Sequence, residues 1–214
     1  MGMFLRRGAV STGPKLGDLD VGTLVKLNEN GSPADFYVAK HDYESILNGT
    51  GRTLLVRKEC ADDVKFSYNY NIYADGLLDT FLNETFFQRL DAGVRARTVS
   101  TKFYYTPGDE DSTLKTLERT IFQLSLTELG FTSNKTNVEG SALPIASTLK
   151  VAYRNGSAVN QWTRTPSTSG SISVYYVTTS GASAFNSGQQ LYGSRPAFCL
   201  PAETKVGDGS LITG

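Results

Sequence analysis

The chain has 214 residues, of which 39% are apolar and 20% charged, and its 21 basic and 21 acidic side chains cancel to a net charge of zero. This composition is that of a globular domain rather than a disordered or collagen-like chain. A balanced charge also argues against nucleic acid as a partner, because binding to phosphate backbones favours a surplus of lysine and arginine.

The sequence lacks the usual signatures of membrane, metal and hydrolase proteins. No run approaches the roughly 20 apolar residues that a spanning helix needs, so membrane insertion is not expected. The opening residues also lack the apolar core of a secretion signal. His41 is the single histidine, and Cys60 and Cys199 are the two cysteines. We therefore expect no metal site, no cofactor and no catalytic residue.

Strand patterns follow a glycine-rich start. Residues 1–20 have little apolar periodicity, which predicts an arm for assembly or anchoring. Runs of β-branched and aromatic residues then predict strands at 21–27, 35–40 and 52–57. A strong turn signal at 28–31 separates the first two. Three short strands with tight connections predict an antiparallel meander.

Helices are predicted in the middle of the chain. After the N-cap candidate Asp75, apolar residues recur at three- and four-residue steps as far as Leu90. A second stripe of this kind runs over 113–129, and a proline near its first turn marks a short helix over 143–153. Between the two longer helices, 99–106 has the pattern of a strand.

The most informative feature is a change of composition near the end of the chain. No residue from Thr165 through Ser194 is Asp, Glu, Lys, Arg or His. The segment is built from Ser, Thr, Gly, Asn, Gln and Tyr, with strands predicted at 175–177 and 184–186. Tyrosine offers wide contact area, and Ser, Asn and Gln offer hydrogen bonds without charge, which suits a neutral polar target such as a glycan. A plain β-region with short polar turns has the same composition, so composition favours neither interpretation.

Three large side chains flank this segment. Trp162 is the single tryptophan, and Arg164 and Arg195 stand at the two borders of the uncharged stretch. We expect all three to be scaffold, with the arginines bound to backbone carbonyls or to a carboxylate that fixes the long loops.

Four motifs in order carry a family resemblance. They are Leu78-Asp-Thr-Phe-Leu-Asn83, Leu126-Thr-Glu-Leu-Gly130, Trp162-Thr-Arg-Thr-Pro166 and Gly193-Ser-Arg-Pro-Ala-Phe198. They resemble the W-L-N-x-x-F, L-S-x-x-E, W-L-R-S-P and G-V-R-P-A motifs of a bacterial and phage domain family that is similar to C-type lectin-like domains of the formylglycine-generating-enzyme type. The likeness spans about residues 20–201, although Phe81 stands where that family often has Trp.

The resemblance implies an α+β fold, with helices flanking a twisted, mostly antiparallel sheet and long irregular loops. The C-type lectin-like domain would occupy 21–201, between the arm 1–20 and a C-terminal tail 202–214 that could pair as an added strand with another subunit. The related enzyme depends on a pair of cysteines near the end of the domain. Cys199 stands alone there, so we expect no enzymatic activity.

The resulting hypothesis is a phage virion protein, on the tail or capsid surface, that recognises a bacterial surface glycan or protein through residues 165–194. Assembly with other virion proteins, and as a homotrimer, would turn weak contacts into firm adhesion. The alternatives are an architectural capsid or tail decoration protein without host binding, and a bacterial adhesin that lacks its export signal. The predicted ligand contacts are Ser169, Ser171, Tyr175, Phe185, Asn186, Gln189, Gln190 and Tyr192.

Overall fold

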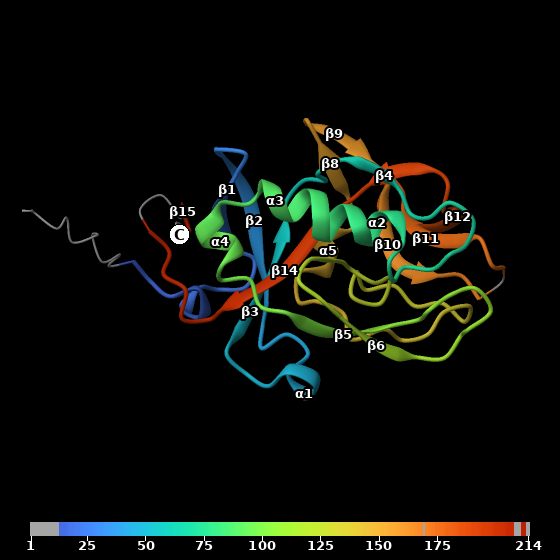
Figure 1. Cartoon of the computed structure of the whole chain (residues 1–214), viewed down its shortest axis with the longest axis horizontal. Helices are drawn as coiled ribbons and strands as arrows, with labels where there is room; N and C mark the ends of the chain where they lie inside the picture. Colours follow the sequence, from blue (N-terminus) through green and yellow to red (C-terminus); the bar gives the residue numbers. More distant parts are fainter. Residues whose placement is uncertain (1–12, 169, 208–210, 213–214) are drawn as a thin grey trace, which may run out of the picture.

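Strands dominate the regular structure (Figure 1). The computed structural model describes residues 13–168, 170–207 and 211–212. Strands account for 38% of the residues and helices for 14%, with one helix of 13 residues. The predicted α+β class, with helices flanking the sheet, is therefore wrong, because the described chain forms several small sheets and is richer in strands than that class.

The larger sheet contains the meander predicted at the start of the chain. It has six strands in the order β15-β1-β2-β3-β14-β7. The antiparallel pairing of β1 with β2 and of β2 with β3 confirms the meander. The strands are β1 (Leu24–Glu29), β2 (Ser32–His41), β3 (Arg52–Arg57), β7 (Phe122–Gln123), β14 (Pro196–Pro201) and β15 (Leu211–Ile212).

The smaller sheet holds most of the uncharged segment. Its five strands have the order β12-β11-β10-β13-β4, and β11 and β12 form the predicted hairpin. Two two-stranded sheets, β5-β6 and β8-β9, complete the described strands. The bounds are β4 (Asp63–Lys65), β5 (Thr101–Tyr105), β6 (Lys115–Arg119), β8 (Ala152–Arg154), β9 (Ser157–Val159), β10 (Gln161–Pro166), β11 (Ser173–Val177), β12 (Ser183–Ser187) and β13 (Leu191–Gly193).

The first predicted helix forms, as a continuous run of α2 (Leu77–Thr80), the π-helical η2 (Phe81–Phe86) and α3 (Phe87–Arg89). The remaining helices are single turns, and no helix in the described part of the chain has the length and apolar character needed to cross a bilayer. These turns are η1 (Leu16–Asp18), α1 (Ser45–Asn48), α4 (Ala92–Arg95) and α5 (Ala146–Leu149).

The helix predicted over 113–129 is wrong. The segment forms β6, β7 and a turn instead. Its apolar residues Phe122, Leu124 and Leu126 also alternate with a period of two, and all three are buried, so the pattern fits a strand as well as a helix. The helix predicted over 143–153 is also too long, because α5 ends at Leu149 and β8 follows.

The two sheets lie toward opposite ends of the long axis (Figure 1), and the segment that contains β7 joins them. β7 pairs with β14 of the larger sheet, and Arg164 N of β10 donates to Leu124 O directly after β7. One apolar cluster runs through both sheets and the helical run, and includes Phe36, Phe122 and Trp162. This junction places the uncharged segment at one end of the molecule.

The described part of the tail packs on its own chain. β15 pairs in parallel with β1, and Ile212 is 1% exposed. Near the start of the chain, Leu16 is buried and its N–H donates to Thr204 O. Residues 1–12 of the predicted arm lie outside the described residues.

The tail contact can be tested with a pair of isoleucine variants. We expect Ile212→Ala to lower the free energy of unfolding by about 2–5 kcal/mol, because it leaves a cavity against β1. Ile46→Ala is the matched control, since Ile46 is 90% exposed and its loss should change stability by less than about 0.5 kcal/mol. Urea unfolding of both variants measures the difference, and equal small changes would contradict the packing of the tail.

Candidate functional site

The structure adds a second uncharged segment to the one found from composition. Residues 66–74 contain no charged side chain and hold Tyr68, Tyr70 and Tyr73. The N–H groups of Phe66 and Ser67 both donate to Gly188 O, at 2.8 and 3.2 Å. Two segments that are far apart in the sequence therefore share one surface.

Large apolar and aromatic side chains of this surface face solvent. Tyr68 is 63% exposed, Tyr70 48%, Ile172 50% and Phe185 51%. A shallow depression lies among the residues of 67–70, Ile172 and 187–189. We call the exposed residues of 66–74 and 172–192 the uncharged surface. Exposed clusters of this kind are characteristic of interaction sites.

Most predicted contacts lie on the uncharged surface. Asn186, Gln189 and Gln190 are exposed, and Gln189 Nε2 donates to Tyr68 O at 2.6 Å. Tyr192 is partly buried, and its hydroxyl accepts a hydrogen bond from Asn186 Nδ2 at 3.0 Å. These polar groups surround the exposed rings.

Three predicted contacts are placed differently. Tyr175 is 6% exposed and its hydroxyl lies 3.1 Å from Ser133 Oγ, so it packs inside the domain instead of facing a ligand. Ser171 is partly buried and lines a separate pocket. Ser169 lies outside the described residues.

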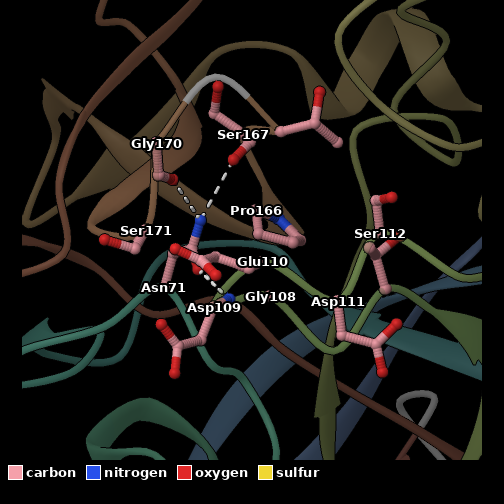
Figure 2. Close-up of a pocket in the computed structure, with 12 residues that line it drawn as sticks. Asn71, Gly108, Asp109, Glu110, Asp111, Ser112, Pro166, Ser167, Gly170 and Ser171 are labelled. Atoms are coloured by element: carbon pink, nitrogen blue, oxygen red, sulfur yellow. Dashed lines mark hydrogen bonds between the residues drawn. The ribbon is translucent and has the colours of Figure 1, made fainter.

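Asn71 ties together the loops beside this surface. It is 1% exposed, and its Nδ2 donates to the carbonyl oxygens of Ser167, Gly170 and Ser173 at 3.1, 2.9 and 3.0 Å. Its Oδ1 accepts the N–H of Asp109 at 2.7 Å. Figure 2 shows Asn71 between the 167–170 turn and the 108–112 loop. One amide side chain thus fixes three segments.

These loops enclose a pocket of about 340 Å³. Its walls include the side chains of Asp109, Glu110 and Asp111 (Figure 2). Lys115 and Thr113 bind Asp111 and hold the pKa of that carboxyl well below its usual range. The pocket therefore offers hydrogen-bond acceptors to hydroxyl or amine groups. In the described chain, no three His, Cys, Asp or Glu side chains are grouped to hold a metal ion.

Gly108 makes the close approach of the acidic loop possible. Its φ is +87°, and a Cβ there would lie 2.5 Å from Asn71 O. A side chain at this position would separate the 106–112 loop from Asn71.

Trp162 supports the uncharged surface from below. It is fully buried, and its Nε1 donates to Val64 O at 2.7 Å. Its ring centroid lies 4.6 Å from that of Tyr192 and 6.2 Å from that of Tyr176. The partly exposed tyrosines of β11 and β13 thus rest on a fixed indole.

Arg164 is fully buried and carries a paired charge. Its Nη1 lies 2.7 Å from Glu128 Oε2, which is equally buried. Its Nε and Nη2 donate to Tyr104 O at 3.0 and 2.9 Å. Burial alone lowers the pKa of Arg164, but Glu128, Tyr43 and Glu139 together outweigh it and raise the pKa above its ordinary value.

Arg195 is held differently, by neutral groups. It is 2% exposed and donates to Arg57 O, Lys58 O and Leu149 O at 2.9, 2.6 and 2.7 Å. Burial lowers its pKa. Gln123 connects the two arginines, because Gln123 Oε1 accepts Arg195 N and Gln123 O accepts Arg164 Nη1, each at 2.9 Å.

Sequence reasoning missed Asn71, Gln123 and Glu128 as parts of this frame. Glu128 had a usable signal, because Ser125 and Glu128 form a capping box in which Ser125 N donates to Glu128 Oε2 and Glu128 N to Ser125 Oγ. Asn71 lies in an uncharged run whose composition matches 165–194. Gln123 has no local pattern, since its partners are distant in sequence.

The residues with nucleophilic or acid–base chemistry are structural. Cys60 and Cys199 are free and buried, and burial raises their pKa values to about 11 and about 12, so both are thiols at neutral pH. His41 contacts Thr53 Oγ1 and Leu19 O through its two ring nitrogens.

Comparison with known proteins identifies one family. A family model described as Domain of unknown function (DUF6273) matches residues 50–202, a range that includes both uncharged segments. No curated protein and no solved structure matches the chain. The comparisons show neither a C-type lectin-like nor a phage family, so the resemblance drawn from the motifs stays a prediction.

The role of Asn71 can be tested against its neighbour Asn69. We expect Asn71→Ala to lower the free energy of unfolding by about 1–3 kcal/mol, because buried backbone groups lose their partner. Asn69 is exposed, so Asn69→Ala should shift stability by less than about 0.5 kcal/mol. Urea unfolding and limited proteolysis of the 106–112 loop provide the readouts. Equal stability of the two variants would contradict the structural role assigned to Asn71.

Glu44, beside the buried Glu128, gives a prediction about pH. Its Oε1 is buried without a hydrogen-bond partner among the described residues. Burial first, and then the Glu128 carboxylate, raise the pKa of Glu44. The folded state therefore holds this proton more tightly than the unfolded chain, and stability falls as the pH rises between the two pKa values.

We expect Glu44→Gln to raise the melting temperature at neutral pH, because it removes this ionisation. At about pH 3 the effect should vanish, since the carboxyl is protonated in both states. Melting curves of wild type and variant across this pH range measure it. A difference that does not grow from acid to neutral pH would refute the assignment.

Proposed function

The chain belongs to the DUF6273 family, and we propose that it is a non-enzymatic recognition module that binds a neutral polar partner through the uncharged surface. The observation that carries this proposal is the convergence of two uncharged segments, 66–74 and 165–194, on one side of the domain. Tyr68, Tyr70, Ile172 and Phe185 are about half exposed or more, whereas the neighbouring rings of Phe66, Tyr73 and Tyr175 are buried.

The chemistry of the surface favours a partner without net charge. Tyrosine and phenylalanine rings pack on sugar rings or on apolar side chains, and their burial supplies most of the binding energy. The exposed amides of Asn186, Gln189 and Gln190 can both donate and accept hydrogen bonds. The two segments carry no charge of their own, and the nearby ammonium groups of Lys65 and Lys135 lie over the rings of Tyr68 and Phe185, each 5.9 Å from the ring centroid.

The frame beneath the surface favours binding without rearrangement. Trp162 supports Tyr192, Asn71 fixes the adjoining loops, and Gln189 Nε2 holds the Tyr68 backbone. Side chains that are positioned before binding lose less conformational entropy when the partner arrives. A rigid surface of this kind suits recognition of a repeated target by several copies at once.

We take a bacterial surface glycan or protein as the partner, and a phage virion as the setting, from the motif resemblance. Oligomeric assembly, proposed as a trimer, would multiply single contacts of modest strength. The acidic pocket beside the surface adds hydrogen-bond acceptors for hydroxyl groups that extend past the aromatic patch.

A second candidate function, an architectural one, is favoured by the edge strand β12. β12 ends the smaller sheet, and its hairpin is closed by bonds from Gly188 N to Ile172 O and from Thr178 N to Ala182 O. By the alternation of antiparallel pairing, the backbone groups of Phe185 then point away from β11. An open, uncharged edge can accept a strand from a neighbouring subunit.

A double variant, Tyr68→Ala with Tyr70→Ala, tests recognition. We expect at least about tenfold weaker binding to bacterial cells or to their isolated surface polysaccharides, because two exposed rings that anchor the partner are lost. The melting temperature should stay within a few degrees, since both side chains are exposed. Flow cytometry with labelled protein and biolayer interferometry measure the binding.

Tyr153→Ala is the matched control, because Tyr153 is 47% exposed but lies on β8, outside the uncharged surface. The control should bind as wild type does. Equal loss in control and double variant would refute the assignment of the surface. Wild-type protein that ignores every cell type and yet self-associates, with Phe185→Pro abolishing the association, would establish the architectural function instead.

A further inference from the structure

A second pocket, of about 270 Å³, lies on another part of the domain. Arg195 lines it, together with Lys58, Thr148 and Val151. Two tyrosines, Tyr37 of β2 and Tyr153 of β8, complete the aromatic part of the wall. Figure 1 shows α5, β8 and β9 as the elements near this part of the fold.

The charge of Arg195 has no carboxylate partner in the described chain. Its guanidinium donates to three backbone carbonyls, those of Arg57, Lys58 and Leu149, and Nη1 also lies 3.5 Å from Gln161 Oε1. A guanidinium has five N–H groups, and Nη2 donates only to Lys58 O, so its second N–H has no acceptor among the described residues. Buried cations are normally paired, because an isolated one is strongly disfavoured.

The other charged groups around the pocket are already engaged. Arg57 Nε lies 2.9 Å from Glu29 Oε1, and Lys58 Nζ lies 3.4 Å from Asp35 Oδ2. Glu59 is the one carboxylate among the lining residues, and its Oε2 accepts the N–H of Asn155 at 3.3 Å. Among the described residues, the Arg195 guanidinium therefore has no bonded carboxylate, although the Glu59 carboxylate lines the same pocket.

We propose that this pocket binds a small ligand that carries a carboxylate. One carboxylate oxygen would accept the remaining Nη2 N–H of Arg195, in the charge-assisted geometry that guanidinium groups favour. Lys58, whose ammonium also contacts Asp35 Oδ2 at 3.4 Å, lines the same pocket. Tyr37, Val151 and Tyr153 then provide an apolar wall for a ring or a short aliphatic chain. The site is separate from the uncharged surface and does not depend on the function proposed for it.

Benzoate and benzamide distinguish a charge-dependent site from a merely apolar one. The two probes share ring and size, and differ in charge. We expect benzoate to bind saturably in calorimetry and to raise the melting temperature with concentration, because it binds the folded state. Benzamide at the same concentration and ionic strength should give no shift. Equal binding of both probes, or binding of neither, would overturn the proposal.

A pair of variants at Thr148 locates the binding. Arg195→Ala is unsuitable, because it removes three structural hydrogen bonds as well as the charge. Thr148 is exposed on α5 and lines the pocket, so Thr148→Glu should place a competing carboxylate at the site and weaken benzoate binding at least about tenfold. Thr148→Gln has the same size without the charge and should keep affinity within about threefold. Unchanged binding by Thr148→Glu would place benzoate elsewhere and refute the site.

Discussion

Two buried arginines, connected by one glutamine, hold the centre of this domain together. Gln123 accepts a hydrogen bond from Arg164 Nη1 through its carbonyl and from Arg195 N through its Oε1, while its Nε2 donates to Trp162 O at 2.6 Å. The two sheets meet at this residue. Buried polar groups favour the arrangement that gives them hydrogen-bond partners and disfavour arrangements that do not. The register between the sheets is therefore fixed by hydrogen bonds rather than by apolar packing alone.

This constraint explains how long polar loops stay ordered at one end of the molecule. The loops have little apolar material to bury, so packing contributes little to their order. Their backbone groups are bound instead by side chains anchored in the core, of which Asn71 connects its own segment to two others. The rings of Tyr68 and Phe185 can remain exposed, because the segments that carry them are ordered by hydrogen bonds and not by burial of these rings.

The sequence predicted the local parts of this arrangement and missed the distant ones. The meander and the β11-β12 hairpin have patterns and turn signals of their own, and both formed. The apolar pattern at 113–129 fits the period of a helix as well as that of a strand. Its hydrogen bonds to β14 and to Arg164 make part of it a strand. The sequence predicted only one of the two segments of the uncharged surface. Composition marks 165–194 clearly, but the shorter run 66–74 joins this surface only through its hydrogen bonds to Gly188 in the folded chain. Contacts such as that of Gln123 with Arg195 join residues far apart in the sequence, so no local sequence pattern predicts them.

The distribution of charge in this domain departs from the usual one in two places. Charged side chains normally cover surfaces, where they keep proteins apart in solution. Here Arg164, Glu128 and Arg195 lie in the interior, while the segments 66–74 and 165–194 carry no charged side chain. A buried charge destabilises the fold unless it has a partner. Arg164 is paired with the Glu128 carboxylate, whereas Arg195 Nε donates to a neutral backbone carbonyl. An exterior without charge raises the tendency to associate. Both departures point the same way: the neutral side gains from being covered by a partner, and the unpaired guanidinium gains from an anion.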